Sequence, residues 1–286
     1  MVGALVLSIL FFGVGQVMAV SLVLDGTVLK VGVDESGGLV NLGVPQGITF
    51  KPGPTPNDFT YPGTPWEFYS LGFNGSTAVG GVAGSALNPI GVVTYDVSSA
   101  ATLKAHTDSH SIILGGAEIA YDQTVSFGKN SNVINFKADL FNVGTITATN
   151  VVYARGLDPD QDVNLFGDFR TINSFPGAGS VFAKGPLTNL AVRIDDLTVG
   201  FAGKTSINFW ETDPYVLSLG GLLNGTNLGL ADYQIAIAWL VGDILPGQSV
   251  EIDWTYTFSR VPEPGILILL GIGLSAVGVL SRRIKF

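Results

Sequence analysis

The chain has 286 residues, of which 47% are hydrophobic and 13% are charged, and it is long enough to bury one sizeable core. Its 38 glycines and 14 prolines favour an all-β body, because these residues are the poorest ones for a helix interior. The absence of cysteine excludes disulfides and thiolate chemistry, and 23 acidic against 14 basic residues disfavour nucleic acid as a partner, because such a surface repels phosphates.

An apolar stretch opens the chain. Residues 2–14 are almost all apolar, and the sequence Val17, Met18, Ala19 follows at the positions that an export peptidase reads. We therefore expect a signal peptide over residues 1–19, with cleavage after Ala19. A buried first strand or an uncleaved anchor is the alternative.

The end of the chain carries a proline-flanked acidic motif, an apolar span and a basic terminus. These are Val261, Pro262, Glu263 and Pro264; residues 265–281; and Arg282, Arg283 and Lys285. At about 1.5 Å per residue the span is shorter than a ~30 Å hydrocarbon core, but it suffices when flanking side chains snorkel. The positive-inside rule keeps the basic terminus cytoplasmic and places the preceding domain outside.

These three elements in this order resemble the PEP-CTERM sorting signal of Gram-negative bacteria, over residues 261–286. The resemblance implies recognition of Pro262, Glu263 and Pro264 by an exosortase-type enzyme in the inner membrane, with Arg282 and Arg283 helping to set the depth of the span. It also implies surroundings of exopolysaccharide and biofilm matrix. An ordinary single-span membrane anchor is the alternative.

Between the two ends, residues 20–260 contain segments that alternate between apolar and polar side chains. Residues 133–140, 233–241 and 250–258 each place their apolar side chains on one face, which is typical of half-buried strands. With no sustained helical periodicity, the sequence predicts a large antiparallel β-sandwich as the exported domain.

Turn residues suggest how the strands connect. Residues 128–132 and 245–248 are rich in turn formers, and both predict antiparallel hairpins between the strands that flank them. Residues 43–65 are rich in proline and glycine, which predicts a long surface loop.

The densest acidic segment has Asp158, Asp160 and Asp162 at alternate positions. Such spacing begins an oxygen-ligand loop for calcium, although Val163 and Phe169 stand where an EF-hand needs its glycine and its bidentate glutamate. A calcium loop of another kind remains open. The alternative is a surface turn whose carboxylates accept bonds from nearby backbone groups.

Other candidate groups are less specific. The only two histidines, His106 and His110, lack a third zinc ligand, and we interpret the segment around them as the polar tip of a hairpin. A carboxylate pair for glycoside hydrolysis could come from Asp195, Asp196, Glu211 and Asp213, but no spacing selects two of them.

Aromatic side chains offer a possible sugar-stacking platform, although strand aromatics more often belong to a core. The candidates are Trp66, Phe68, Tyr69, Trp210, Tyr215 and Trp239.

The sequence thus predicts an exported protein, anchored in the inner membrane as a precursor and then carried to the cell surface or matrix. We expect its β-domain to act as a structural or adhesive module without catalytic residues, and with calcium as the only candidate cofactor. The alternative is a secreted carbohydrate-binding or carbohydrate-active β-sandwich.

Overall fold

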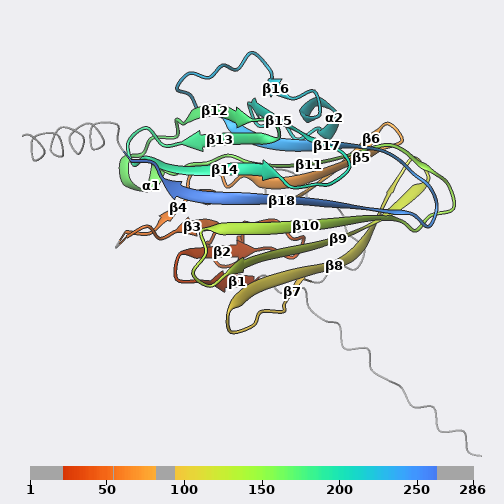
Figure 1. Cartoon of the computed structure of the whole chain (residues 1–286), viewed down its shortest axis with the longest axis horizontal. Helices are drawn as coiled ribbons and strands as arrows, with labels where there is room; N and C mark the ends of the chain where they lie inside the picture. Colours follow the sequence, from red (N-terminus) through yellow and green to blue (C-terminus); the bar gives the residue numbers. More distant parts are fainter. Residues whose placement is uncertain (1–21, 54, 82–93, 263–286) are drawn as a thin grey trace, which may run out of the picture.

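The computed structural model describes residues 22–53, 55–81 and 94–262 (Figure 1). The expected signal peptide with its cleavage site after Ala19, and the sorting tail from Glu263 onward, lie outside these residues. Within the described part, no helix combines the length and the apolar character that a membrane crossing needs.

The described chain is almost entirely β-structure, in three sheets. A small antiparallel sheet has the order β1-β2-β3-β4, with strands β1 (Leu22–Asp25), β2 (Leu29–Val33), β3 (Ile48–Phe50) and β4 (Asn57–Asp58). The strands β3 and β4 interrupt the segment 43–65, which the sequence predicts to be loop throughout. They form because Ile48 and Phe50 bury their side chains between the prolines.

The largest sheet has eight antiparallel strands in the order β12-β13-β14-β18-β10-β9-β8-β7. Its strands are β7 (Thr94–Asp96), β8 (Thr102–Leu114), β9 (Ala117–Gly128), β10 (Val133–Asn142), β12 (Ile172–Gly177), β13 (Ser180–Lys184), β14 (Leu190–Asp196) and β18 (Ser249–Arg260). Side chains along β9 alternate strictly between buried and partly exposed, as expected for a strand with one face on a core.

A third sheet has six strands in the order β16-β15-β17-β11-β5-β6, antiparallel except for the pair β15 and β16. Its strands are β5 (Glu67–Phe73), β6 (Ser76–Gly81), β11 (Ala148–Leu157), β15 (Gly203–Asn208), β16 (Gly221–Leu222) and β17 (Gln234–Ile244). Two short helices, α1 (Val163–Phe166) and α2 (Pro214–Leu217), lie in its connections.

The two large sheets pack face to face, so the predicted β-sandwich is confirmed for the described residues. Their inward side chains form one core, in which the rings of Tyr121 and Tyr153 are 5.8 Å apart and those of Trp239 and Trp254 are 5.3 Å apart. Every residue of β5 is buried, because a second apolar cluster that includes Leu217 of α2 covers the outer face of its sheet.

A buried ion pair ties β5 to its neighbour β11. The Arg155 Nε atom donates to Glu67 Oε1 at 2.6 Å, and both side chains are fully buried. The other carboxylate oxygen of Glu67 accepts the Leu39 amide N–H at 2.6 Å. The Arg155 guanidinium also lies 5.1 Å from the ring centroid of Phe136 and 5.9 Å from that of Trp254.

One predicted hairpin is confirmed and another is wrong. Strands β9 and β10 pair across the turn at 129–132, as the sequence predicts. The turn at 245–248 joins strands of different sheets, since β17 pairs with β11 and β15 whereas β18 pairs with β10 and β14. The two strands meet through the side chains of Trp239 and Trp254 across the core, and this packing replaces edge-to-edge pairing.

The predicted hairpin tip around the histidines is also wrong. Strand β8 continues from Thr102 to Leu114, with a register shift between Thr107 and His110. The chain turns afterwards, at Gly115 and Gly116, whose φ angles of 55° and 84° suit a tight hairpin that only glycine adopts at low cost.

Candidate functional site

One end of the six-stranded sheet gathers residues that are distant in sequence. Because neighbouring strands are antiparallel, β5 and β17 begin at the end where β11 and β15 stop. Trp66 precedes β5, Asp158 follows β11, Trp210 follows β15, and Asp232 precedes β17. The fold therefore brings two indoles and two carboxylates to one place.

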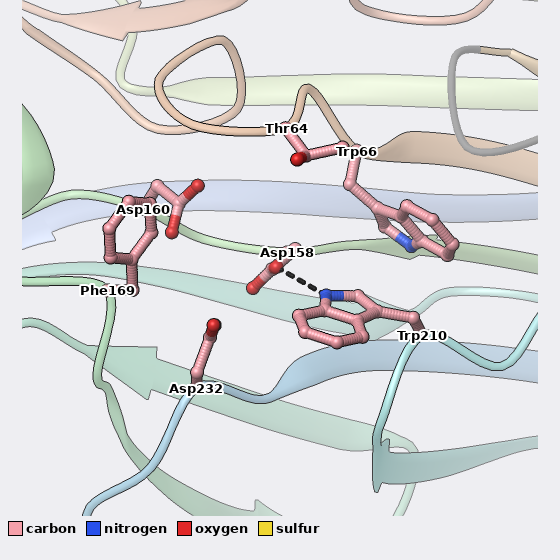
Figure 2. A pocket seen from close by; sticks show the side chains of 7 residues that line it. All are labelled: Thr64, Trp66, Asp158, Asp160, Phe169, Trp210 and Asp232. Carbon is pink, nitrogen blue, oxygen red and sulfur yellow. Dashed lines mark hydrogen bonds between the residues drawn. The ribbon is translucent and has the colours of Figure 1, made fainter.

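A pocket of about 320 Å³ opens there (Figure 2). In Figure 2, three carboxylates face the space between Phe169 and the two indoles. The residues that line the pocket are Thr64, Trp66, Asp158, Asp160, Phe169, Trp210 and Asp232.

The backbone of Trp210 adopts an uncommon conformation. Its φ angle is +42°, in the left-handed region that bulky residues rarely occupy, and 49% of the residue is exposed. The indole Nε1 donates to Asp158 Oδ2 at 2.7 Å. Strain of this kind concentrates at functional sites, and here it aims an indole at the pocket.

Trp66 forms a second aromatic wall. Its indole Nε1 donates to Gln234 Oε1 at 2.7 Å, and Gln234 Nε2 donates to the backbone carbonyl of Glu211 at 2.9 Å. The rings of Trp66 and Trp210 are 6.4 Å apart, with their planes inclined by 54°. The indoles thus form an open corner that a flat ligand face can enter.

Phe169 stands opposite the indoles, and 41% of it is exposed. Its position depends on Gly63, because a Cβ atom at residue 63 would lie 2.5 Å from Phe169 Cε1. Gly63 also has a φ of +72°, so a larger residue there would be strained and would push the ring away.

The three carboxylates lie close together. Asp158 and Asp160 are only 5% and 3% exposed, Asp232 is partly buried, and one oxygen from each lies within 4.8 Å of the others. Burial, and then the charge of Asp232, raises the pKa of Asp158 to about 7. Burial, and then Asp158 and Asp232, raises the pKa of Asp160 to about 9. Three negative charges at this distance therefore need a counterion or protons.

Asp162 does not join Asp158 and Asp160. Its carboxylate accepts the amide N–H groups of Leu187 at 2.7 Å and Thr188 at 3.1 Å, and also bonds the Thr188 hydroxyl. Asp162 thus fixes the turn before β14 by accepting bonds from backbone groups, but it is buried and does not belong to a surface turn. Asp232, and not Asp162, is the third carboxylate beside Asp158 and Asp160.

The predicted aromatic platform is divided between the pocket and the core. Trp66 and Trp210 line the pocket. Phe68, Tyr69 and Trp239 are fully buried. Tyr215 lies on α2, where its hydroxyl donates to the carbonyl of Asn150 at 3.3 Å.

The predicted carboxylate candidates for hydrolysis have structural partners. Asp195 accepts bonds from Arg193 and Ser180, and Asp196 accepts the Trp239 indole N–H at 2.8 Å. Glu211 and Asp213 accept backbone N–H groups in the loop before α2 and at its N-terminus. Neither pair lines the pocket.

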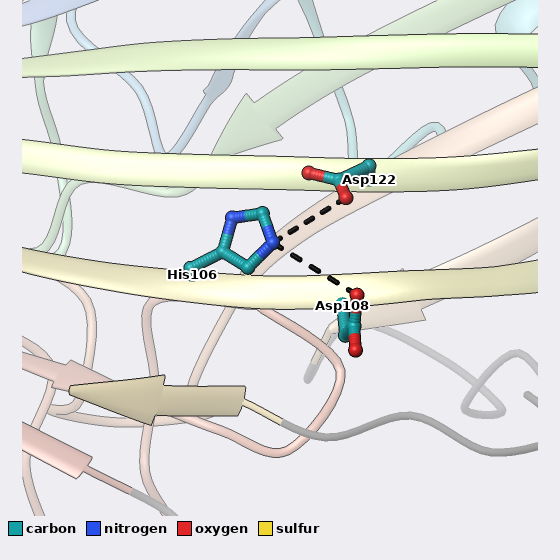
Figure 3. A group of neighbouring side chains, drawn as sticks. All are labelled: His106, Asp108 and Asp122. Carbon is teal, nitrogen blue, oxygen red and sulfur yellow. Dashed lines mark ion pairs between the residues drawn. The ribbon is translucent and has the colours of Figure 1, made fainter. Parts of the chain in front are cut away.

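A second group with carboxylates lies on the eight-stranded sheet (Figure 3). His106 Nε2 is 3.4 Å from Asp122 Oδ2 and 4.0 Å from Asp108 Oδ1, and its Nδ1 lies 3.2 Å from Thr124 Oγ1. Asp108 is largely exposed, so this group of one histidine and two carboxylates lies at the surface, on the neighbouring strands β8 and β9.

Sequence reasoning missed Phe169, Thr64 and Asp232 as pocket residues. Asp232 lies 72 positions after Asp160, and it becomes a neighbour only through the pairing of β17 with β11. Backbone hydrogen bonds between Thr171, just before β12, and Ala231, just before β17, also tie these two parts of the chain together. No spacing in the sequence signals this contact.

Comparison with known proteins finds no matching family model and no matching curated protein. Solved structures with a similar course of the chain include a candidate aldose 1-epimerase from Escherichia coli, with 10% identity and a TM-score of 0.45 over 85% of this chain and 99% of that one. Another is an α-mannosidase from Enterococcus faecalis, with 10% identity and a TM-score of 0.46 over 86% of this chain and 30% of that one. A third is an α-N-acetylgalactosaminidase from Bifidobacterium bifidum, with 9% identity and a TM-score of 0.43 over 92% and 39%. The chain thus spans less than half the length of the last two.

Proposed function

We propose that this protein binds carbohydrate in the pocket at the end of the six-stranded sheet. The observation that carries the proposal is the combination of two partly exposed indoles with buried carboxylates around one cavity. One face of a sugar ring is made of C–H groups and packs on aromatic rings, while its hydroxyls donate to carboxylate oxygens. The volume of about 320 Å³ is at the small end for ligand pockets and suits a ring or the end of a chain.

We propose further that this domain acts outside the cell, at the surface or in the matrix, where binding to exopolysaccharide serves adhesion. The support is the order of the apolar first segment, the Val261–Pro264 motif, the apolar span and the terminal arginines. The Val261 N–H donates to the Asn189 carbonyl at 2.8 Å, and Pro262 is exposed, so the chain leaves β18 directly at the motif. An exosortase-type enzyme would find that motif close to the folded domain.

Glycoside processing is the second candidate, and the spacing of the carboxylates favours it. Retaining enzymes place two carboxyl groups about 5–5.5 Å apart. One oxygen from each of the three pocket carboxylates lies within 4.8 Å of the others, so these groups are close enough to supply such a pair. Such an enzyme also needs one ionised carboxylate, which burial disfavours for both Asp158 and Asp160.

A glycan array tests the binding function. The full chain, purified in a detergent without sugar headgroups, should retain a defined set of glycans, and Trp66→Ala should lose them. The control is Tyr95→Ala, which removes a 39% exposed aromatic from an edge strand of the other large sheet. Equal glycan binding by parent and Trp66→Ala would exclude this pocket, and release of reducing sugar from a bound glycan would favour the enzyme.

A further inference from the structure

Three carboxylate oxygens at the pocket have no hydrogen-bond partner among the described residues. They are Asp158 Oδ1, Asp160 Oδ1 and Asp232 Oδ1. A buried carboxylate oxygen without a donor is costly, and native structures rarely keep one without a partner. Because Asp158 and Asp160 are at least 95% buried and both line the pocket, their free oxygens indicate a missing ligand there.

No positive side chain of the described residues neutralises this group. The residues that line the pocket include no lysine, arginine or histidine, and none of the three aspartates takes part in an ion pair within the described part of the chain. The missing ligand therefore carries positive charge or donates protons.

The chemistry of the ligands selects the kind of cation. One oxygen from each of the three aspartates lies within 4.8 Å of the others, so a single ion can contact all three. A site made only of carboxylate oxygens suits a hard cation and disfavours zinc. Calcium tolerates irregular geometry and takes six to eight oxygens, whereas magnesium needs a near-ideal octahedron, so carboxylates contributed by separate loops favour calcium.

We propose that Asp158, Asp160 and Asp232 bind one calcium ion at the base of the pocket. Calcium takes six to eight oxygen ligands, so three carboxylates leave positions for water or ligand hydroxyls on the pocket side. Asp158 uses Oδ2 to accept the Trp210 indole N–H and keeps Oδ1 for the ion. The ion thus holds the Asp158 carboxylate in place, and this carboxylate orients Trp210. Trp210 is then an outer-shell partner of the metal site.

This site differs from the loop of alternating aspartates that the sequence suggests. Asp162 is occupied by the turn before β14, and Asp232 takes the third position from another part of the chain. Substitution of Asp162 and Asp232 therefore distinguishes the two ligand sets.

Terbium luminescence and calorimetry test the proposal on the full chain after treatment with chelator. Terbium replaces calcium and is excited through nearby tryptophans, so the parent should show a sensitised signal that calcium chloride displaces with one ion per chain. Asp232→Asn and Asp160→Asn should each lower calcium affinity at least tenfold, while Asp162→Asn should keep it within about threefold. Circular dichroism of each variant without cation checks that it is folded.

Three results would overturn the proposal: no heat with millimolar calcium chloride, an Asp232→Asn variant that binds like the parent, or loss of binding in Asp162→Asn alone. Absence of binding would leave shared protons as the partners of these oxygens. All measurements are made without sugar, so they do not depend on the proposed carbohydrate function. Repeating the glycan array with chelator then shows separately whether sugar binding needs the ion.

Discussion

Replacement of Arg155 by methionine should destabilise the protein strongly, because it leaves the buried Glu67 carboxylate without its counterion. Both side chains are fully buried, and methionine fills much of the space of the arginine stem. Burial raises the pKa of Glu67, and the Arg155 guanidinium opposes that rise. Without the guanidinium, Glu67 should be protonated in the folded protein at pH 7.

The magnitude follows from that protonation. Each pKa unit corresponds to about 1.4 kcal/mol, so protonating an ordinary glutamate of pKa about 4.3 at pH 7 costs about 4 kcal/mol. This agrees with the roughly 3–5 kcal/mol lost when one partner of a buried ion pair is removed. Since the folded pKa of Glu67 is raised, the loss should be small below about pH 4 and grow as the pH rises above it.

Urea denaturation of the full chain, followed by tryptophan fluorescence, measures this loss. The double variant Glu67→Gln, Arg155→Met is the control, because a neutral amide can still accept the Leu39 N–H. It should recover about half of the loss at pH 7 and remove its dependence on pH. An Arg155→Met variant within about 1 kcal/mol of the parent, or a double variant less stable than the single one, would show that the unpaired Glu67 carboxylate does not cause the loss.

Three further predictions concern other parts of the chain. The pKa of Asp168 is lowered to about 2, chiefly by its hydrogen bonds with Arg170, so the contribution of this carboxylate to stability is complete above about pH 4 and lost toward pH 2. Melting temperatures of the parent and Asp168→Asn should therefore differ slightly at pH 7 and coincide at pH 2. A difference that persists at pH 2 would contradict this prediction. Calcium should raise the melting temperature of the parent by several degrees, since an ion that binds only the folded state stabilises it, and calorimetry that shows no shift with saturating calcium would count against the site. Replacing Pro262, Glu263 and Pro264 by alanines should leave export intact but cause an unprocessed precursor to accumulate in the inner membrane, as fractionation and mass spectrometry can show; processing equal to the parent would leave a plain anchor.

The strands that face one core were predictable from sequence because their side chains alternate. This pattern identifies β10, β17 and β18 within a few residues. It does not say which sheet a strand joins, since the same inward face serves a hairpin or a crossover. Strands β17 and β18 are an example: both turn a tryptophan toward the core, Trp239 and Trp254, but they belong to separate sheets that face each other there.

The candidate site was only partly predictable. The sequence indicates Asp158, Asp160, Trp66 and Trp210 as candidates, but as members of separate motifs. Their union depends on antiparallel pairing that brings strand ends together over long sequence distances, and Asp232 enters only through this pairing. Local hydrogen bonds also decide which aspartates remain available, and such bonds take Asp162 out of the group.

Carbohydrate binding in the pocket is tested most directly by a calorimetric titration of a glycan from the array into the parent and into Trp210→Ala. We expect at least tenfold weaker binding by Trp210→Ala, or about 1.4 kcal/mol, because the substitution removes a pocket wall and leaves Asp158 Oδ2 without its donor. Tyr95→Ala, the exposed aromatic on the other large sheet, should bind like the parent. Equal affinity of the parent and Trp210→Ala would contradict the central claim that this pocket binds carbohydrate.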